Sequence, residues 1–579
     1  MPSNGQIVVI GAGINGAAVA REIVLSGVPV VVVDADDVAC GATAWSTRLV
    51  HGGLRYLEYG EVALVRESLA ERDRLVTLAP HLVRPLPFYL PLQRRLGGLV
   101  SAAARILGCE GLARQCAGRH GRGGIAVAIG LSLYDMLAVG GRWPRHHLVR
   151  GGGPGLPRVD VARFPLGATY ADAQMLAPER FTVELLVDAR RAARQQGTTF
   201  EVHTHSRATL LPDGRLRIVP GDDGAAIAGP AEEIRPLALI NATGAWVDRT
   251  LAGLAATAAG GFLPGGPLIG GTKGSHLVVR SALLREALAE HGVYAEAEDG
   301  RPVFVLPFAD DLVLVGTTDI PHGGDPDTAR TDAGEIAYLL AATARLFPQV
   351  ALSAAEVQQH YCGVRPLPAR SASGVPAGVT RRHMLVPHPQ APLPTWSIVG
   401  GKLTTCRSLA ETAAATVLGR LGLPIRGSSR TRPLPGAWQG RTREDVVRET
   451  AAAAGRCGVA AERTAAVAER VVALFGSRGP EIFATPGGSR AAGRLLPGSD
   501  LPAAAVDFCV REEWARTLED LVERRLLLAF APGLHRTMLE AVAAELADLG
   551  LLSADRVAAA AGAEAQRLGE RFGKRVPPA

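Results

Sequence analysis

The chain begins with the pattern that most restricts its fold: an apolar strand, a glycine-rich turn and a helix. The pattern predicts a strand over Ile7–Ile10 and a helix over Ala17–Ser26, with Gly-Ala-Gly-Ile-Asn-Gly at residues 11–16 between them. A second apolar strand, Val28–Val33, follows and leads into Asp34. In this order, strand, turn, helix and second strand form the βαβ unit of a parallel sheet that binds a dinucleotide.

Each glycine of the turn has a separate physical role. Gly11 permits the tight turn, Gly13 lets backbone N–H groups approach a pyrophosphate, and Gly16 lets the helix pack closely against the strand. The unpaired N–H groups and partial positive charge of the helix N-terminus face the phosphates. Asp34 follows Gly16 by eighteen residues, where a carboxylate can accept hydrogen bonds from ribose hydroxyls.

Length and composition exclude several classes of protein. A chain of 579 residues with 47% hydrophobic residues should form two to four globular domains. It contains no run of eighteen apolar residues, so no transmembrane helix is expected, and a strand that starts at Ile7 leaves no room for a secretory signal. Its seven cysteines form no Cys-X-X-Cys pair, so we expect no metal site and a reduced, cytoplasmic location.

The positive charge of the chain is concentrated in one stretch. Residues 93–150 hold nine arginines against Glu110 and Asp135, a net charge of +7, so with a total of +6 the rest of the chain carries −1. Apolar residues between Leu96 and Leu112 could form a helix face with arginines beside it. Such a helix can lie in an anionic membrane interface, whereas the glycines within it favour a solvated insertion or a substrate funnel.

Lysine is rare, with three lysines against 59 arginines. Because arginine supplies the ordinary surface charge, a lysine inside a glycine-rich motif indicates a specific role. Lys273 lies in Gly-Gly-Thr-Lys-Gly-Ser-His at residues 270–276, and Lys402 lies in Gly-Gly-Lys-Leu-Thr-Thr at residues 400–405. Lys574, near the end of the chain, is expected to be solvated surface.

Two later strands are predicted to return to the nucleotide-binding sheet. One ends at Thr243-Gly244, and the other, Ser397–Val399, ends in glycines and opens a helix over Thr404–Leu418. The start of that helix can face an anion or a polarised ring atom. Strand ends that are distant in sequence but meet at one ligand imply a discontinuous nucleotide domain.

Further polar residues form candidate catalytic and anion-binding groups. His51 and Arg55 are four residues apart and would share a face if the segment were helical. Arg365, followed by a proline, Arg381 and Lys402 make a candidate cationic pocket.

Seven motifs together resemble the FAD-dependent glycerol-3-phosphate dehydrogenases, the aerobic, membrane-associated type that passes electrons to quinone. In chain order they are Ile10–Gly16, Leu-Val-His-Gly-Gly-Leu-Arg-Tyr at 49–56, Asn-Ala-Thr-Gly-Ala-Trp at 241–246, Lys-Gly-Ser-His at 273–276, Val-Gly-Thr-Thr-Asp at 315–319, Gly-Val-Arg-Pro-Leu at 363–367, and Gly-Gly-Lys-Leu-Thr-Thr at 400–405. The segment around Arg511–Trp514 resembles the C-terminal domain of that family. The resemblance therefore covers nearly the whole chain.

The resemblance implies a non-covalent FAD and a set of residues around it. The implied cofactor-binding residues are Gly11, Gly13, Asn15, Gly16, Asp34, Ser46, Thr47, Thr243, Gly244, Asp319, Gly401, Leu403 and Thr404. The implied substrate-binding residues are Arg55, Tyr56, Arg365, Arg381 and Lys402. Two positions depart from the family: Asp34 stands where relatives often have glutamate, and Arg48 where many have lysine. The basic block after Leu92 is also longer than we expect for the family.

The implied reaction is oxidation of sn-glycerol 3-phosphate at C2 to dihydroxyacetone phosphate, with hydride transfer to flavin N5. A histidine suits the base for the hydroxyl proton, and we favour His276 over His51. Lys402 and Arg55 would stabilise the developing alkoxide. Several cations around the substrate fit a phosphate dianion.

The predicted fold class is α/β, with a discontinuous Rossmann-like FAD-binding domain, an inserted α+β substrate domain and a C-terminal helical domain. The expected FAD-binding segments are residues 1–90, 161–250 and 356–425, and the expected substrate segments are 91–160 and 251–355. A helix of period 3.6 is expected over Val62–Leu78, and Pro-Gly-Asp-Asp-Gly at residues 220–224 predicts a hairpin. A linker at 426–439 leads to the helical domain, 440–579, with amphipathic runs over Glu444–Ala454, Ala460–Phe475 and Glu512–Phe530. This domain could form a homodimer or cover the substrate domain.

We expect a cytoplasmic protein that sits peripherally on the inner face of the cell membrane and reduces quinone. The alternatives are an oxidase that uses O₂, and a flavoenzyme for another hydroxy acid or an amino acid. A module that binds tRNA or lipid is a third reading of the basic stretch. We expect no nucleic-acid partner, because residues 93–150 hold only Tyr134 and Trp143 for base stacking.

Overall fold

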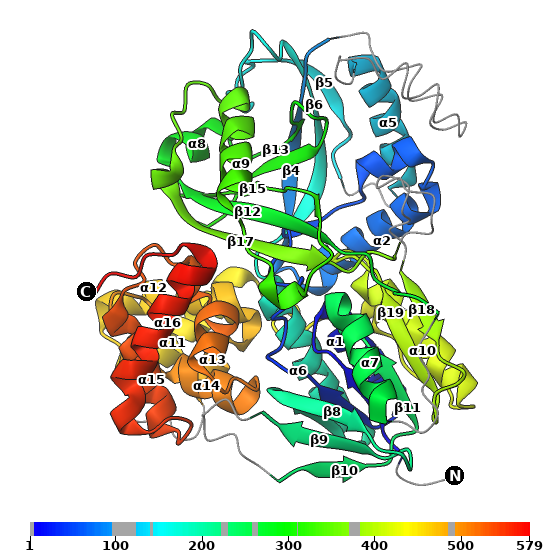
Figure 1. The fold of residues 1–579 in the computed structure, drawn as a ribbon. Coiled ribbons are helices and arrows are strands. Elements are labelled where there is room, and N and C mark those ends of the chain that lie inside the picture. The colour runs from blue at the N-terminus through cyan, green and yellow to red at the C-terminus, as the bar shows by residue number, and fades with distance from the viewer. Residues whose placement is uncertain are drawn as a thin grey trace.

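The computed structural model describes residues 5–94, 123–138, 143–221, 230–257, 265–309, 311–369, 383–484 and 493–578. Residues 95–122 and 139–142 of the basic stretch and the candidate substrate residue Arg381 lie outside this set. The chain forms an upper and a lower α/β body, with a helical domain beside the lower one (Figure 1).

The lower body is built on a six-stranded sheet in the order β18-β19-β11-β1-β2-β7. The strand β1 pairs in parallel with β2 and with β11, and β19 pairs in parallel with β11. The strand bounds are β1 Ile7–Ile10, β2 Val30–Val33, β7 Phe200–His203, β11 Ala238–Asn241, β18 Met384–Pro387 and β19 Thr395–Val399. The valine- and isoleucine-rich central strands are buried on both faces, as parallel sheets require.

Three helices pack together on one side of this sheet. They are α1 Ile14–Leu25, α6 Pro178–Gln196 and α10 Cys406–Arg420, and α1 contacts both of the others. The helix α1 is rich in alanine, and its buried Ala17, Ala18 and Ala20 allow close packing. The helix α7, Val247–Thr257, lies in front of the sheet (Figure 1).

The upper body is a larger sheet in the order β16-β12-β15-β14-β13-β4-β6-β3, with β17 paired to β12 and β5 paired to β6. The bounds are β3 Leu49–Val50, β4 Val83–Leu92, β5 His147–Arg150, β6 Leu166–Met175, β12 Thr272–Arg280, β13 Gly292–Glu296, β14 Pro302–Pro307, β15 Leu312–Gly316, β16 Ile320–Pro321 and β17 Val357–Arg365. The helices α8, Ala282–Ala287, and α9, Ala333–Leu346, lie beside it, with α5, Gly124–Leu137, on the other side (Figure 1).

The chain passes between the two bodies more often than the predicted segments allow. The strands β4, β6 and β17 fall in or at the edge of ranges predicted for the FAD-binding domain, yet they pair within the larger sheet. Periodicity identifies a strand but not its partner, so the sequence could not make this assignment. The helix predicted behind the nucleotide motif is observed as α2, Val62–Leu78.

A small antiparallel sheet joins the lower body. It consists of β8 Ser206–Leu210, β9 Leu216–Pro220 and β10 Glu232–Ile234. The predicted hairpin near Pro220 agrees with the antiparallel pairing of β9 and β10, although its turn, residues 222–229, is outside the described set.

The C-terminal domain is helical, as predicted. Its α-helices are α11 Arg443–Arg456, α12 Thr464–Phe475, α13 Gly479–Ile482, α14 Ala504–Glu512, α15 Arg536–Asp548 and α16 Val557–Phe572. The first two predicted amphipathic runs correspond to α11 and α12. No helix in the described part of the chain is both long and apolar enough to cross a membrane.

The prediction of one continuous helix over Glu512–Phe530 is wrong. The helix α14 ends at Glu512, and the following segment forms a π-helical turn at Asp520–Arg525 and a 3₁₀ turn at Leu528–Phe530. The π-helical turn carries buried charged side chains that form ion pairs with the lower body. An amphipathic period does not reveal such contacts.

The expectation that Lys574 is solvated is also wrong. Its side chain is buried, and Nζ donates to the carbonyl oxygen of Ala531 at 2.9 Å. Burial lowers the pKa of Lys574 to about 8.

Buried ion pairs join the C-terminal domain to the lower body. Arg180 of α6 pairs with Glu513, and Asp37 pairs with both Arg524 and Arg525. All of these side chains are almost completely buried. Removing one partner would leave an uncompensated charge, so each pair fixes where the domain can dock.

We expect the stability of this docking to depend on pH through His205. Its Nε2 lies 3.0 Å from Asp520, with Asp37 and Arg524 close by. Burial alone would lower the pKa of His205, but the hydrogen bond and charge of Asp520 raise it to about 9. The stabilisation is therefore complete below about pH 6.5 and is lost as the pH rises through about 9.

Thermal unfolding at pH 6.5 and pH 9.5 measures this effect. We expect the native protein to lose on the order of 2–3 kcal/mol of stability over that interval, and His205→Gln to lose much less. Equal losses in the two proteins would contradict the role given to His205.

Candidate cofactor and substrate site

One cavity of ≈ 700 Å³ lies between the two bodies. The lower sheet lines it with residues that follow the carboxyl ends of β1, β2, β11 and β19, and the larger sheet lines it from β12 and β17. Crevices at the carboxyl ends of parallel strands are the usual ligand sites of open α/β sheets, and the volume lies in the range of small-molecule and cofactor sites.

The glycine turn has the close packing that its sequence predicts. Gly11 has a positive φ of 105°, and a Cβ there would lie 2.7 Å from the carbonyl oxygen of Ala242. A Cβ on Gly16 would lie 1.9 Å from the carbonyl oxygen of Gly11, so only glycine lets α1 sit against the turn. Gly13 lines the cavity, and its Cβ position meets only the Thr43 hydroxyl, at 3.6 Å.

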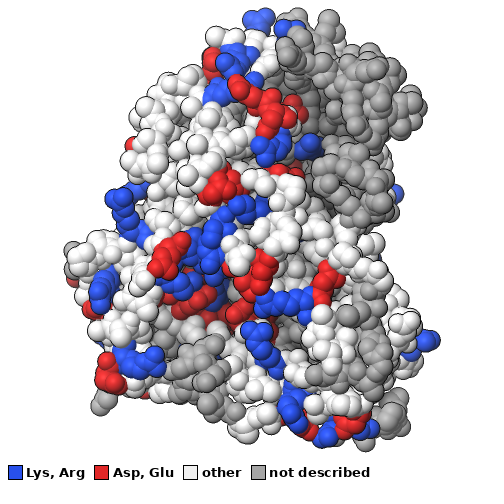
Figure 2. All heavy atoms as spheres, in the orientation of Figure 1, with Lys and Arg blue, Asp and Glu red and all other residues white. Residues whose placement is uncertain are grey.

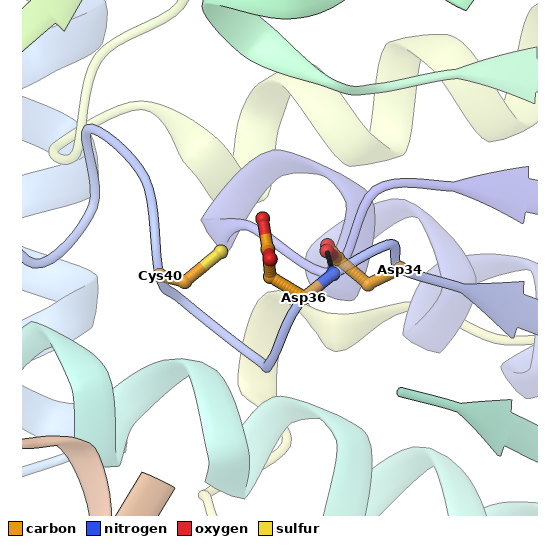
Figure 3. Close-up of side chains that lie close together, drawn as sticks. All are labelled: Asp34, Asp36 and Cys40. Atoms are coloured by element: carbon orange, nitrogen blue, oxygen red, sulfur yellow. Dashed lines mark hydrogen bonds between the residues drawn. The ribbon is translucent and has the colours of Figure 1, made fainter. Parts of the chain in front are cut away.

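Asp34 lines the cavity where it follows β2. Its carboxylate accepts hydrogen bonds from the backbone N–H of Ala12 at 2.5 Å and of Asp36 at 2.9 Å. The side chains of Asp34, Asp36 and Cys40 lie close together (Figure 3). Burial raises the pKa of Asp34 to about 6 and also raises that of Asp36. The carboxyl of Asp34 is thus placed to accept from a hydroxyl-bearing ligand.

Asn15 connects the glycine turn with the strand end at Gly400. Its Nδ2 lies 3.4 Å from the carbonyl oxygen of Gly400, and a Cβ on Gly401 would lie 2.5 Å from the same nitrogen. Gly401 has a φ of 104°, which favours glycine. Asn15 Oδ1 is buried and has no hydrogen-bond partner among the described residues, so it is an acceptor available to a ligand in the cavity.

The predicted flavin-contacting segments meet at the cavity. Its lining includes Ser46, Thr47, Thr243, Gly244, Leu403 and Thr404. The hydroxyl of Thr404 accepts a hydrogen bond from the backbone N–H of His51 at 3.1 Å, which ties the segment after β3 to the start of α10. Residues that were predicted to bind the cofactor, from four separate parts of the chain, thus line one cavity.

His276 is buried at the cavity wall on β12. Its Nε2 lies 2.9 Å from the Thr47 hydroxyl, and its ring stacks on Tyr361 with centroids 5.0 Å apart. Burial holds the pKa of His276 well below its usual value, and the charges of Arg365 and Arg48 lower it further. The imidazole is therefore neutral near pH 7, as a proton acceptor must be.

Lys402 and Tyr56 face each other in the same cavity. The ammonium group of Lys402 lies 3.7 Å from the centroid of the Tyr56 ring. The tyrosine ring stabilises a cation at this position without neutralising it. His51 also lines the cavity and is only half-buried.

Arg365 enters the cavity from the end of β17. Its guanidinium donates to the Thr317 hydroxyl at 2.9 Å and pairs with Asp319 at 3.1 Å. A Cβ on Gly274 would lie 2.0 Å from Nη2 of Arg365, so the glycine of Lys-Gly-Ser-His makes room for the guanidinium. Asp319, predicted to contact the cofactor, is not among the cavity-lining residues in the described chain and instead orients Arg365.

The idea that His51 and Arg55 share a helical face is wrong. Gly53 has a φ of 79°, and a 3₁₀ helix, Leu54–Tyr59, starts only after it. Tyr56 reaches the cavity, whereas Arg55 is not among the described residues that line it. Lys273, singled out as a lysine in a glycine-rich motif, pairs with Glu335 at 2.8 Å and supports the strand end instead.

Several residues at the site were not predicted. The Thr43 hydroxyl accepts from the N–H of Ile14 at 3.1 Å, at the start of α1. Tyr361 carries the stacked His276, and its hydroxyl donates to the carbonyl oxygen of Ser46 at 3.1 Å. Neither residue lies in a motif that periodicity or glycine spacing identifies, although Tyr361 immediately precedes the Cys-Gly-Val-Arg segment.

The cavity is bridged by charged residues of both bodies. Arg249 of α7 pairs with Asp325 at 3.1 Å and with Asp327 at 2.8 Å, and Arg249 and Asp327 both line the cavity. Figure 2 shows acidic and basic side chains intermingled over the middle of the face on which α7 lies.

The residues present fit an extended dinucleotide with a redox-active ring. The glycine turn and the N-terminus of α1 suit a pyrophosphate, and Asp34 suits a ribose. A neutral imidazole, a lysine and an arginine line the same cavity. This set can hold an anionic alcohol and accept its proton.

Two sequence families match the chain and together cover most of it. The family described as FAD dependent oxidoreductase matches residues 6–386. The family described as the C-terminal domain of alpha-glycerophosphate oxidase matches residues 428–557.

Curated relatives match over nearly the full length. A glycerol-3-phosphate dehydrogenase of Synechocystis sp. is 33% identical over 544 residues, which is 90% of this chain and 89% of that protein. The aerobic glycerol-3-phosphate dehydrogenase of Escherichia coli is 31% identical over 530 residues, covering 90% and 93%. The D-erythritol 1-phosphate dehydrogenase of Brucella abortus is 30% identical over 536 residues, covering 90% and 94%.

A solved structure has the same fold. The glycerol-3-phosphate dehydrogenase from Bacillus halodurans, complexed with FAD, superposes with a TM-score of 0.68 at 21% identity, covering 98% of this chain and 95% of that one. This likeness confirms the predicted fold class.

The tight packing at Gly16 gives a direct test of the dinucleotide turn. We expect Gly16→Ala to lose most of its FAD binding, because its Cβ would collide with the Gly11 carbonyl oxygen and displace α1. The measurement is titration of the purified apoprotein with FAD.

Gly419→Ala serves as the matched control. Gly419 is an exposed residue of α10 whose Cβ position meets nothing within 4 Å. This change should leave FAD affinity unchanged and stabilise the helix by about 0.5–1 kcal/mol. Native-like FAD affinity in Gly16→Ala would contradict the placement of the turn.

Proposed function

The chain belongs to the FAD-dependent oxidoreductase family that includes the glycerol-3-phosphate dehydrogenases, and from this premise we propose that it oxidises sn-glycerol 3-phosphate to dihydroxyacetone phosphate. One observation carries the proposal. Lys402, Arg365 and His276 line the same cavity as the glycine turn and Asp34. When bound, FAD supplies at N5 the acceptor for the hydride from C2 of the substrate.

The cations of the site suit the phosphate and the reacting oxygen. Arg365, held by Thr317 and Asp319, brings a guanidinium to the cavity, and a guanidinium suits a phosphate dianion. Lys402, on the ring of Tyr56, stabilises the alkoxide that develops as the hydroxyl proton leaves. Arg55 and Arg381 remain proposed members of this group.

His276 is our choice for the base. Its ring is fixed by Tyr361 and Thr47, and its low pKa keeps it neutral. A proton accepted at Nε2 remains within hydrogen-bond distance of the Thr47 hydroxyl. His51, which also lines the cavity and is hydrogen-bonded to Thr404 through its backbone, is the alternative base.

A second substrate is favoured by one comparison. The relative named D-erythritol 1-phosphate dehydrogenase is 30% identical, close to the 31–33% of the glycerol-3-phosphate dehydrogenases. Both substrates are polyol monophosphates, so the cationic set fits either of them.

Turnover with a dye acceptor decides between the substrates. We expect kcat/KM for sn-glycerol 3-phosphate to exceed that for D-erythritol 1-phosphate by roughly tenfold or more, the scale of discrimination of a shaped pocket. Faster oxidation of the longer polyol would overturn the assignment. Consumption of O₂ at the same rate as dye reduction would show an oxidase instead.

The pH dependence of turnover tests the base. Because the pKa of His276 lies well below its usual value, we expect kcat at saturating substrate to stay constant as the pH falls through 6.5 and to decline only at lower pH. His276→Gln should lower kcat by about 10²–10⁴-fold and remove that decline. His51→Gln is the matched comparison, and a larger loss in it than in His276→Gln would make His51 the base.

We propose that electrons pass from FAD to a membrane quinone. We also propose that the helix α5 binds the protein to the membrane surface. One face of α5 exposes Ile125, Ile129 and Met136, and Met136 is 80% exposed. The strand β5 pairs with β6, which α5 also contacts, and in the segment around it exposed Leu148 lies between exposed Arg145 and Arg150 in sequence. Apolar side chains flanked by arginine match an anionic membrane interface at the cytoplasmic face.

Vesicle sedimentation tests this surface. We expect Ile129→Asp/Met136→Asp to reduce binding to anionic phospholipid vesicles by roughly fivefold or more, because two apolar contacts become charges. Dye-linked turnover in solution should not change. Ile425→Asp, at a similarly exposed apolar residue elsewhere, is the control. Undiminished binding by the double variant would exclude α5 as the membrane surface.

A further inference from the structure

The loop of residues 34–43, between β2 and the segment that leads to Ser46, has two different neighbours. On one side it lines the cofactor cavity with Asp34, Asp36 and Cys40 (Figure 3). On the other side it contacts the C-terminal domain through Asp37. One short loop therefore lies between the cavity and the C-terminal domain, whose contacting residue Arg524 is 487 residues from Asp37 in sequence.

The cavity side of the loop is organised around the start of α1. Asp34 accepts from the N–H of Ala12, Ala39 donates its N–H to the carbonyl oxygen of Ala12 at 3.1 Å, and the Thr43 hydroxyl accepts from Ile14. The first residues of α1 are those expected to face the pyrophosphate. A shift of the loop would move both Asp34 and these N–H groups.

The other side of the loop is held by a buried charge cluster. The carboxylate of Asp37 is fully buried, and Arg525 donates to its two oxygens at 2.7 Å each. Arg524 adds a third hydrogen bond at 2.6 Å. Both arginines belong to the π-helical turn of the C-terminal domain. A bidentate arginine–carboxylate pair fixes direction as well as distance.

A second contact reinforces the first. His205 donates its backbone N–H to the carbonyl oxygen of Asp36 at 2.7 Å, while its ring contacts Asp520. Asp520 also accepts from Arg524 at 3.0 Å. The loop is thus bound to the π-helical turn both directly and through His205.

We infer that Asp37 and Arg525 are positioning residues through which the C-terminal domain holds the 34–43 loop in the geometry that binds the ribose and pyrophosphate of FAD. The inference rests on the use of FAD and not on the identity of the substrate. Burying two charges is costly, and apolar residues of similar size could join the domains equally well. An ion pair at this point adds directional control of the loop that carries Asp34.

The test is the affinity of the apoprotein for FAD, followed by flavin fluorescence. We expect Asp37→Asn to raise the dissociation constant of FAD at least roughly tenfold, because the neutral amide cannot hold both guanidinium groups. Arg525→Gln should have a similar effect. The FAD dissociation constant of the double variant should be little higher than that of either single variant, because both substitutions break the same contact.

Arg180→Gln is the matched control. Arg180 also forms a buried pair across the domain interface, with Glu513, but it does not touch the loop, and Glu513 keeps Arg478 as a partner. This variant should lower the unfolding temperature and leave the FAD dissociation constant within about twofold, as expected for an independent site.

Two results would overturn the inference. One is a folded Asp37→Asn with unchanged FAD affinity, and the other is an equal loss of affinity in Arg180→Gln, which would show only a general effect of loosened docking. If Asp37→Asn does not fold, Arg525→Gln, which leaves Arg524 paired with both Asp37 and Asp520, decides the question on its own. Failure to oxidise glycerol 3-phosphate would leave these FAD affinities unaffected.

Discussion

The parallel pairing of β1 with β2 and β11, and of β11 with β19, is the constraint on which the site depends. Ile10 lies opposite Val33 and Asn241, so the residues after these strands emerge at one edge of the sheet. The glycine turn, Asp34, Thr243-Gly244 and Gly400–Lys402 all follow from this register. The larger sheet then adds His276 and Arg365 from its paired strands β12 and β17.

Much of this could be predicted because parallel strands and glycine turns leave local signals. The strands around the cavity and the convergence of their ends were expected from apolar runs that lead into glycine or aspartate, and the helix α2 was expected from its 3.6-residue period. The helical face expected to carry both His51 and Arg55 does not form, because the positive φ of Gly53 interrupts the segment. The same periodicity also failed at Glu512–Phe530, where buried ion pairs with another domain decide the backbone.

Arginine has two different uses in this chain. Arg180, Arg524 and Arg525 are buried and fix the interface of the C-terminal domain. Arg48, which stands where many relatives have lysine, is fully buried, pairs with Glu179 and stacks on Phe530 of the C-terminal domain, with its guanidinium 4.7 Å from the ring. Composition cannot separate such structural arginines from those that meet a ligand. The C-terminal domain therefore contacts both Arg48 and the loop of residues 34–43.

The central claim is that cations and a neutral histidine gathered from distant strands act on a substrate beside bound FAD. Anaerobic mixing of the FAD-loaded protein with sn-glycerol 3-phosphate tests it most directly. The oxidised flavin absorbance should bleach, and Lys402→Ala, with normal FAD content, should bleach at least about 10²-fold more slowly. No bleaching of the native protein, or an unchanged rate in Lys402→Ala, would contradict the claim.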